Sequence, residues 1–159
     1  MKIKVGFGYD VHQLAEGLPL WLGGVKFEHS KGMVAFSDGD VLIHAICDAL
    51  LGAANLRDIG YHFPNTDPTW EGADSKLLLS HVCLMLREKG WEISNIDASL
   101  AAEHPKINPR IVEMQEVLAH AMGISAEDVS IKATTNEKLG YVGREEGVNA
   151  YAVALIIKV

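Results

Sequence analysis

Apolar residues between Ser37 and Asn55 recur three and four positions apart, which is the spacing of one buried face of an α-helix. The segment opens with serine, aspartate and glycine residues that favour a helix start, and it contains no proline. It therefore predicts a long central helix. His44 lies on this helix, one turn from Asp40 and one turn from Asp48. The predicted buried stripe consists of Ile43, Ile46, Cys47, Leu50, Leu51 and Ala54.

Two more helices and five extended segments are predicted from the rest of the pattern. Asp74 and Ser75 offer an N-cap for a helix over 76–89. A third helix is predicted from Asn108, as its N-cap, to Gly123. The extended segments are 3–12, 18–27 with a bulge or turn at its two glycines, 93–103, 129–135 and 148–159.

The last of these segments, 148–159, is apolar at both its odd and its even positions. A strand buried on both faces needs a helical layer on one side and a second cover on the other, and another subunit is a candidate for that cover. Together the elements predict a two-layer α+β domain, with helices packed on one face of a mixed four- to five-stranded β-sheet. The whole chain, 1–159, is expected to form one domain.

Composition narrows the class of protein. Apolar residues make up 48% and charged residues 22% of the 159 residues, which is typical of a folded globular domain. The net charge of −7, without a run of lysine or arginine, argues against nonspecific nucleic-acid binding. Cys47 and Cys83 lie in helical patterns and are interpreted as buried thiols of a reducing compartment. Because no signal-peptide pattern or membrane-spanning run is found, we expect a cytoplasmic protein.

The segment 56–74, between the first two helices, is rich in aspartate, glycine, proline, asparagine and threonine and is predicted to be a loop. A connection this long without regular structure is uncommon inside a compact domain and is more often functional or mobile. Within it, Asp58 beside Gly60 is placed to accept hydrogen bonds from the hydroxyl groups of a substrate. The alternative for the same residues is simple turn chemistry.

Asp10, His12 and His44 are the candidate metal ligands. Asp10 and His12 are two positions apart on a predicted strand, so both side chains leave the same face. With His44 they form a set of three ligands that suits Zn²⁺ and leaves a fourth position open, as a catalytic metal requires. From spacing alone, the alternative is a surface turn together with an independently packed helix histidine.

A candidate phosphate site lies where the strand 129–135 leads into Asn136 and Glu137. The hydroxyl groups of Thr134 and Thr135, with free backbone N–H groups at a predicted helix start, would bind phosphate. Glu137 would hold a Mg²⁺ ion that bridges phosphates. The alternative is a short helix capped by Thr135 or Asn136 that binds nothing.

Several motifs, taken in order, resemble one known family. They are D-V-H near the N-terminus, S-D-G-D-V-L-I-H-A-I-C-D-A-L-L-G-A-A, D-I-G, F-P-N-T-D-P, an A-x-x-P-K run ending at Lys106, K-A-T-T-N-E-K-L-G and G-R-E-E-G. Together they closely resemble the 2-C-methyl-D-erythritol 2,4-cyclodiphosphate synthase family. The resemblance extends from Val5 to Lys158.

This resemblance implies a homotrimeric enzyme with its active sites at the subunit interfaces. The family consists of phosphorus–oxygen lyases of the non-mevalonate isoprenoid pathway. They convert 4-diphosphocytidyl-2-C-methyl-D-erythritol 2-phosphate into 2-C-methyl-D-erythritol 2,4-cyclodiphosphate and release CMP. The implied cofactors are Zn²⁺ on Asp10, His12 and His44, and Mg²⁺ or Mn²⁺ on Glu137. An isoprenoid diphosphate in a cavity on the trimer axis is a further candidate ligand.

The resemblance also implies roles for individual residues. Thr135 would stabilise the transition state. Tyr9, Arg144 and Glu146 match residues that line the axial cavity of the family. Residues 63–67 would form a mobile loop over the substrate, and the run that ends at Lys106 would hold the cytidine. The implied substrate-binding residues are Asp10, His12, Ser37, Asp58, Ile59, Gly60, Phe63, Pro64, Asn65, Thr66, Asp67, Ala102, Pro105, Lys106, Thr134, Thr135, Asn136, Glu137, Tyr141 and Arg144.

The chain departs from the family at Phe36. A histidine usually precedes S-D-G-D, where it contacts substrate phosphate and stabilises the transition state, and phenylalanine can do neither. Losing one such donor costs about two or three orders of magnitude in rate. Asn136 and Asn65 replace the usual threonine and aspartate and keep their hydrogen-bonding capacity.

We therefore predict a functioning cyclodiphosphate synthase that tolerates Phe36. The alternative is a catalytically weakened homologue or variant that still binds cytidine nucleotide or isoprenoid diphosphate. A zinc hydrolase, in which water attacks and the product is linear, is the third reading. Product analysis separates the three.

Overall fold

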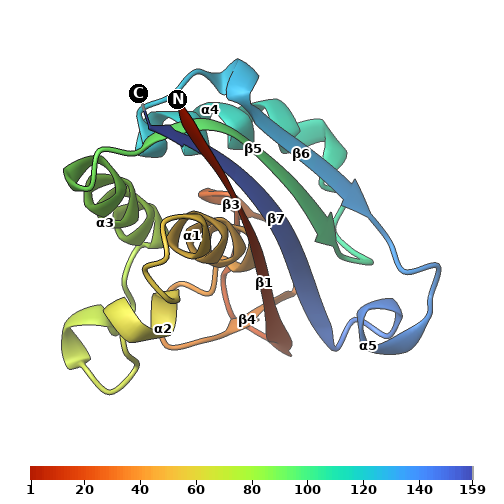
Figure 1. Cartoon of the computed structure of the whole chain (residues 1–159). Coiled ribbons are helices and arrows are strands. Elements are labelled where there is room, and N and C mark those ends of the chain that lie inside the picture. Colours follow the sequence, from red (N-terminus) through yellow and green to blue (C-terminus); the bar gives the residue numbers. More distant parts are fainter. Residues whose placement is uncertain (159) are drawn as a thin grey trace.

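A five-stranded mixed β-sheet forms the centre of the protein (Figure 1). The computed structural model describes residues 1–158. The strands of this sheet are β1 (Lys2–Glu16), β4 (Lys31–Val34), β5 (Glu92–Ala101), β6 (Val129–Thr134) and β7 (Gly147–Lys158). Their order across the sheet is β4-β1-β7-β5-β6, and all neighbours are antiparallel except the parallel pair β5 and β6. A mixed sheet is what the sequence predicts.

Helices cover one face of this sheet. Figure 1 shows α1 and α3 to the left of β1 and α4 behind β5; α1 packs against β1, β7 and α3, and α4 packs against α3 and β6. The helices are α1 (Val41–Ala53), α2 (Ile59–His62), α3 (Ser75–Glu88), α4 (Ile111–Met122) and α5 (Gly140–Gly143), and the 3₁₀ turns are η1 (Pro68–Trp70), η2 (Asn108–Arg110) and η3 (Ala126–Asp128). The α+β prediction, with helices on one face of a mixed sheet, is confirmed. Among residues 1–158, no helix combines the length and the apolar character needed to cross a membrane.

The boundaries differ from the sequence prediction in several places. The segment predicted over 18–27 is a separate hairpin of β2 (Leu20–Leu22) and β3 (Val25–Phe27), which turns at its two glycines. The strand predicted over 3–12 continues to Glu16 because its far end pairs with β4, which the sequence pattern did not reveal. The strand predicted over 148–159 begins at Gly147, and Val159 lies outside the described residues.

Asn108 is not the N-cap of the third helix, which corrects the prediction. The backbone N–H of Arg110 donates to the carbonyl of Ile107 at 2.9 Å, so a 3₁₀ turn forms first. The α-helix begins only at Ile111, without a side-chain cap. In contrast, Asp74 caps α3 as predicted, because its carboxylate accepts the N–H of Lys76 at 2.9 Å.

The start of α1 is held by Asp40, which is fully buried. Its carboxylate accepts the N–H of Ile43 at 3.1 Å, as an N-cap does, and also the N–H groups of Gly23 at 2.9 Å and Gly24 at 2.7 Å. Burial raises the pKa of this carboxyl group, while the N–H of Gly24 lowers it. One side chain therefore joins the hairpin turn to the helix start.

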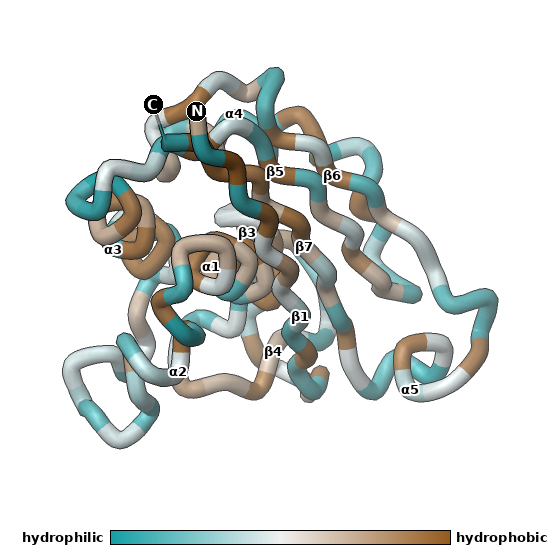
Figure 2. The backbone as a smooth tube through the Cα atoms, in the orientation of Figure 1, coloured by the Kyte–Doolittle hydropathy of each residue, from teal (hydrophilic) through white to brown (hydrophobic). Residues whose placement is uncertain are grey.

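The buried stripe predicted for α1 is confirmed: every one of its six residues is buried. Both cysteines are free thiols buried in the helical layer. Hydrophobic positions gather on α1 and α3 and also along the strands (Figure 2). The inner face of β7 carries the buried Ala152 and Ala154, whereas Tyr151 and Val153 on the outer face are each 41% exposed. The outer face of the sheet thus has no cover within the described chain.

Glycines on the inner face of β1 let α1 lie directly against the strand. A Cβ atom on Gly8 would lie 1.9 Å from the carbonyl oxygen of Ala45, and one on Gly6 would lie 1.9 Å from that of Ala49. The large apolar residues of β1 alternate with these glycines and point outward, with Phe7 62% exposed. The usual arrangement, in which the apolar side of a strand faces the helices, is therefore reversed in β1.

This close approach predicts that Gly8→Ala is strongly destabilising. The added methyl group meets the helix backbone, so α1 must move, and we expect the free energy of unfolding to fall by about 3 kcal/mol or more. Gly52→Ala is the matched control. Gly52 lies on α1, and a Cβ atom added there would lie 4.0 Å from its nearest neighbour, the carbonyl oxygen of Phe7. Alanine should therefore raise the free energy of unfolding by about 0.5–1 kcal/mol. Urea unfolding of both variants measures the contrast, and equal effects would contradict the packing argument.

Candidate metal centre and adjoining pockets

Asp10, His12 and His44 converge at the N-terminal end of α1. Asp10 and His12 continue the inward-facing positions of β1 beyond its glycines, and His44 lies in the first turn of the helix. Oδ2 of Asp10 lies 2.9 Å from Nε2 of His12 and 3.1 Å from Nδ1 of His44, and these two nitrogens are 3.0 Å apart. One ligand atom from each residue lies within 4.8 Å of the other two. The three side chains therefore form a candidate site for a divalent metal.

The charges at this centre favour an ionised carboxylate. Burial raises the pKa of Asp10, but the hydrogen bonds from His12 and His44 outweigh it and hold that pKa well below its usual value of 3.8. For His44, burial lowers the pKa, and the hydrogen bond and charge of Asp10 raise it above 6.5. The carboxylate thus attracts positive charge, whether it is carried by a proton on the imidazole or by a metal ion.

The other nitrogen of His44 is also fixed by hydrogen bonds. Nε2 lies 2.9 Å from Oγ of Ser75 and 3.2 Å from Oγ of Ser37. The hydroxyl group of Ser75 donates to the carboxylate of Asp38. The His44 ring is thereby oriented with Nδ1 toward Asp10 and His12.

A cavity of about 220 Å³ adjoins these ligands. Six of the predicted substrate-site positions line it together with His12 and His44. These six are Phe36, Ser37, Ile59, Gly60, Phe63 and Asn65. The remaining lining residues are Ala35, Trp70 and Leu78. Residues far apart in the sequence thus form one pocket beside the candidate metal centre.

Four predicted residues of the 56–74 segment lie outside this lining. Asp58 caps α2 by accepting the N–H of Tyr61 at 2.9 Å, and Asp67 caps η1 by accepting that of Thr69 at 2.9 Å. Pro64 and Thr66 also do not line the cavity. Asp58 and Asp67 therefore make turn contacts in the structure, and their roles toward a substrate stay predictions.

The segment 56–74 is more ordered than the prediction of a loop implies. It contains α2 and η1, and the N–H of Ile59 donates to Asp48 at 2.8 Å. The rings of Phe63 and Trp70 pack edge to face with centroids 4.9 Å apart. These contacts hold the segment against α1, so the sequence pattern underestimated its regular structure.

A second cavity, of about 360 Å³, lies at the carboxyl ends of β5 and β6. All three residues predicted to hold the cytidine line it, and so do both predicted phosphate-binding threonines. The lining residues are Ala102, Glu103, Pro105, Lys106, Ile107, Asn108, Pro109, Ala133, Thr134 and Thr135. The parallel pairing of β5 and β6 brings these two distant parts of the chain together.

No helix begins at Thr135–Glu137, which corrects the prediction of a helix start there. Glu137 and Lys138 have positive φ angles of 53° and 64°, and such residues turn the chain out of a helical path. Oγ1 of Thr135 accepts the N–H of Glu137 at 3.2 Å, and the N–H of Asn136 donates to Glu103 at 3.2 Å. Neither Thr135 nor Asn136 caps α5, which starts at Gly140.

Tyr141 and Arg144 lie on the far side of β1. The hydroxyl of Tyr141 accepts a hydrogen bond from Asn149 at 2.8 Å and lies 3.4 Å from that of Tyr9. Tyr9, Tyr141 and Glu146 line a third cavity, of about 480 Å³. Arg144 is not among its lining residues and forms an exposed ion pair with Glu146 at 2.9 Å.

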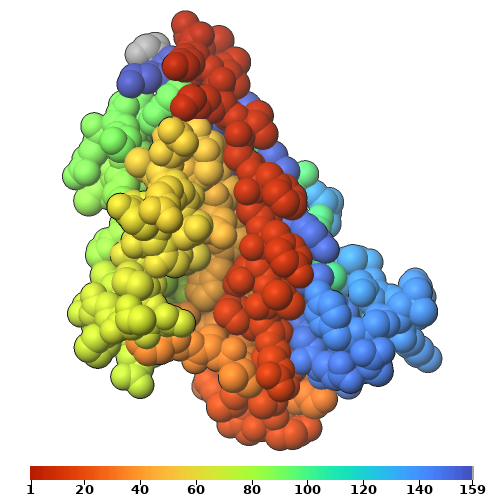
Figure 3. Space-filling view, turned by 60° about the horizontal axis from the view of Figure 1, so that its bottom comes forward, coloured from red at the N-terminus to blue at the C-terminus, as the bar shows by residue number. Residues whose placement is uncertain are grey.

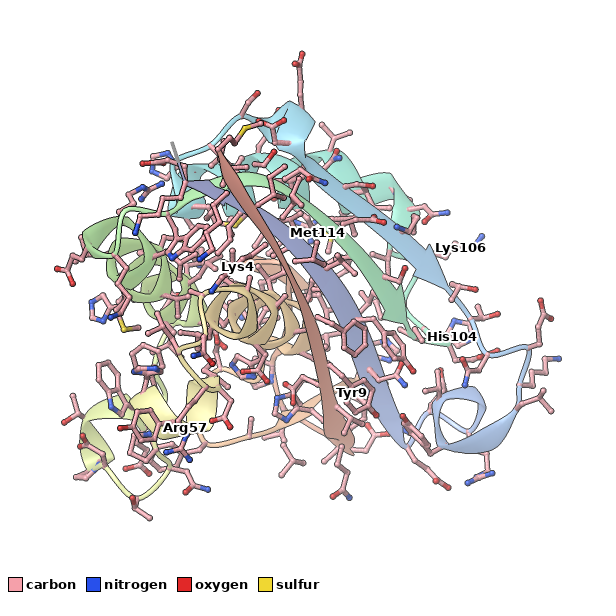
Figure 4. The ribbon with its side chains drawn as sticks, in the orientation of Figure 1. Lys4, Tyr9, Arg57, His104, Lys106 and Met114 are labelled. Carbon is pink, nitrogen blue, oxygen red and sulfur yellow. The ribbon has the colours of Figure 1, made fainter. Side chains whose placement is uncertain are left out.

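The metal-side pocket and the second cavity share no lining residue, and the pair of strands β1 and β7 runs between them. Figure 4 shows Lys106 beside the ends of β5 and β6, and Arg57, at the start of the 56–74 segment, on the opposite side of β1 and β7. Figure 3 shows β1 as a ridge between that segment and the region of α5. Within one chain, the predicted residues of the metal-side pocket and those of the second cavity therefore form two separate groups, and Tyr141 and Arg144 belong to neither.

Comparisons with known proteins agree with this geometry. A family model described as the YgbB family matches residues 3–157. A 2-C-methyl-D-erythritol 2,4-cyclodiphosphate synthase from Cytophaga hutchinsonii is 74% identical over 99% of both chains. Two solved structures are also similar. Bifunctional IspDF from Campylobacter jejuni has a TM-score of 0.95 at 40% identity, covering 99% of this chain and 43% of the longer one. The CDP complex of Plasmodium falciparum IspF has a TM-score of 0.86 at 32% identity, covering 98% and 96%.

An α+β fold that brings one carboxylate and two imidazoles together beside a pocket defines a protein with a candidate divalent-metal site. The match over residues 3–157 makes the identification specific: the chain belongs to the YgbB family. The resemblance to cyclodiphosphate synthases stated from the motifs is confirmed by relatives that carry this name. These relatives support the synthase reading and not the alternative of a homologue that only binds.

Sequence reasoning missed five residues of the metal-side pocket and its supports, among them Ala35 and Leu78 in the lining. Ser75 and Asp38 contact the His44 ring directly or through one hydroxyl, and Trp70 lines the pocket. Ser75 and Asp38 were assigned only to helix starts, because capping and ligand support use the same residue types. The tryptophan within a polar segment was a usable signal for Trp70, since a large aromatic residue there needs a packing partner.

The ion pair between Asp10 and His44 predicts the pH dependence of the metal-free protein. The raised pKa of His44 adds stability that is fully present below pH 6.5, the pKa of an unperturbed histidine. This stability is lost as the pH rises through the higher pKa of His44 in the folded protein. The lowered pKa of Asp10 adds stability that is present above 3.8 and is lost at lower pH. With chelator present, urea unfolding should show stability falling as the pH rises above 6.5, and Asp10→Asn should reduce that slope. An unchanged slope in the variant would exclude this pair as its source.

Proposed function

We propose that the chain converts 4-diphosphocytidyl-2-C-methyl-D-erythritol 2-phosphate into 2-C-methyl-D-erythritol 2,4-cyclodiphosphate and CMP, as a phosphorus–oxygen lyase of the non-mevalonate isoprenoid pathway. One observation carries the proposal. Asp10, His12 and His44 converge beside a pocket lined by the 56–74 segment, in a chain 74% identical to a named cyclodiphosphate synthase. The free buried thiols Cys47 and Cys83 support a cytoplasmic location for this pathway step.

The reaction joins two phosphate groups of the same molecule. An oxygen of the 2-phosphate attacks the β-phosphorus, and CMP leaves as a stable anion that needs no general acid. Because both reacting groups are negatively charged, the site must offset their repulsion and hold them in line. Catalysis of this kind consists mainly of positioning and electrostatic stabilisation.

The donor atoms at the metal centre suit Zn²⁺. Two imidazole nitrogens and one carboxylate oxygen make a three-ligand set that leaves a fourth position for a phosphate oxygen. Glu137 is exposed, as a ligand shared with a substrate diphosphate has to be, and would hold Mg²⁺ or Mn²⁺. When bound, these ions supply positive charge to the two phosphates.

The chain's own residues would bind and enclose the substrate. The second cavity offers apolar walls at Ala102 and Pro105 for a cytosine ring, and Lys106 supplies a positive charge. The hydroxyl groups of Thr134 and Thr135 in the same cavity would donate to the diphosphate, with Thr135 stabilising the transition state. The 56–74 segment would exclude water, which would otherwise compete with the 2-phosphate.

Active sites formed between three copies of the chain would unite the two groups of residues. A substrate that reaches from the metal centre to the nucleotide cavity needs both groups together, although β1 and β7 separate them within one chain. The exposed outer face of the sheet supplies an apolar surface for this assembly, with Ile3, Val5 and Phe7 54%, 63% and 62% exposed. The third cavity, with Tyr9 and Glu146, would then lie near the trimer axis, where an isoprenoid diphosphate is the candidate ligand.

Turnover of Phe36→His tests the proposed function. Phe36 lines the metal-side pocket, where histidine would add a donor to the substrate phosphate. We expect the parent to form the cyclic diphosphate slowly and the variant to form it about two to three orders of magnitude faster. Phosphorus NMR of the products, with zinc and magnesium supplied, provides the measurement.

Tyr61→His is the matched control, because it places a histidine on the 56–74 segment outside the pocket lining and should leave the rate unchanged. A linear product would indicate hydrolysis by water and overturn the proposal. Cyclisation by the variant alone, with a parent that only binds CMP, would support the binding-only alternative.

The trimer is tested by a charge on the outer face of the sheet. Phe7→Glu places a carboxylate where we expect three apolar faces to meet, so the assembly should dissociate to monomers that no longer turn over substrate. Leu77→Glu, on α3 and 61% exposed, is the control and should remain trimeric. Light scattering coupled to size-exclusion chromatography measures the mass, and a trimeric Phe7→Glu would refute this interface.

A further inference from the structure

A hydrogen-bonded chain connects the candidate metal ligand His44, through Ser75 at the start of α3, to the half-buried carboxylate of Asp38, which precedes α1. Nε2 of His44 lies 2.9 Å from the hydroxyl of Ser75, and this hydroxyl lies within hydrogen-bond distance of Oδ1 of Asp38. Oδ2 of Asp38 accepts the backbone N–H of Ser75 at 2.9 Å. Ser75 is fully buried, and His44 is 8% exposed.

The direction of each hydrogen bond in this chain follows from the chemistry of the groups. A carboxylate can only accept, so the single hydroxyl hydrogen of Ser75 points to Asp38. Oγ of Ser75 is then left as an acceptor toward His44, which favours a proton on Nε2. In a neutral imidazole that proton on Nε2 leaves Nδ1 with its lone pair free. Nδ1 is the nitrogen that faces Asp10, 3.1 Å away.

We propose that Ser75 and Asp38 are positioning residues for the metal site: they hold the His44 ring in the tautomer and orientation in which Nδ1 binds a divalent cation. This inference rests on the metal site of the proposed function but not on the cyclisation step. Contacts of this kind beyond the direct ligands typically change metal affinity 10- to 100-fold.

The same contacts attach the end of the 56–74 segment to the metal centre. Ser75 is the first residue of α3 and directly follows that segment. The N–H of Gly72 donates to the carbonyl of Phe36 at 2.8 Å, and the N–H of Asp38 donates to that of Ala73 at 3.1 Å. The backbone that leaves the pocket wall is therefore fixed to the residues that orient His44.

Zinc affinity of Ser75→Ala tests the inference on the full-length protein. Removing the hydroxyl group leaves Nε2 with only the longer contact to Ser37, so we expect zinc to bind about 10- to 100-fold more weakly in competition with a chromophoric chelator. Ser80→Ala is the matched control on the same helix. The hydroxyl of Ser80 donates only to the backbone carbonyls of Lys76 and Ala121, so its loss should leave zinc affinity unchanged.

Nitrogen NMR of the His44 ring in the metal-free protein separates positioning from a general structural effect. At a pH where His44 is neutral, the Nε2–H tautomer should form a larger fraction in the parent than in Ser75→Ala, because the Ser75 oxygen accepts from Nε2 while the Asp10 carboxylate competes for the proton at Nδ1. If Ser75→Ala fails to fold, Asp38→Asn takes its place, because it removes the charge that fixes the hydroxyl direction and should also weaken zinc binding.

The outcomes separate failure of the metal site from failure of the positioning role. A parent that binds no zinc refutes the metal site of the proposed function, and this inference with it. A parent that binds zinc, with equal affinity and the same tautomer in Ser75→Ala, refutes only the positioning role of Ser75 and Asp38. Weaker binding with an altered tautomer in Ser75→Ala, and neither in Ser80→Ala, supports it.

Discussion

The contact between α1 and the glycines of β1 is the constraint on which the candidate site depends. The carbonyl oxygens of Ala45 and Ala49 occupy the space in which side chains at Gly8 and Gly6 would lie. Because the helix lies so near the strand, His44 in its first turn reaches Asp10, two residues beyond Gly8. Any larger residue at either glycine would displace the helix and separate the ligands. Backbone packing therefore determines the geometry of the metal centre before any ligand contributes.

Local patterns were sufficient to predict the parts of the fold that local forces determine. The stripe of α1 and the cap at Asp74 follow from helical periodicity and from capping preference, and both are present. β4 and α5 were not predicted because they are short and are stabilised by distant partners. The helix start predicted at Thr135 is absent because Glu137 and Lys138 adopt positive φ angles. Glutamate and lysine rarely adopt such angles, so the sequence did not predict them.

The candidate site was predictable only where a motif carried it. The spacing of Asp10 and His12 indicated one shared face, and the residue types made His44 the candidate third ligand, but only the family resemblance favoured this set over an independently packed histidine. Ser75 and its partner Asp38 could not be recognised, since their contact with the His44 ring depends on how α3 packs against α1. The separation of the metal-side pocket residues from those of the second cavity also requires the three-dimensional arrangement, because the sequence orders residues along the chain and not around a strand.

Because side chains alternate along β1, the two faces of the strand carry different residues with different functions. Inward positions carry the glycines and then Asp10 and His12, while outward positions carry Phe7 and its apolar neighbours. Since the side-chain period of a strand is two, a one-residue insertion within β1 would exchange these faces for every residue on one side of it. Phe7 would be driven into the helix backbone, or the ligands would turn outward. Natural length variation in this family should therefore be confined to positions outside this strand.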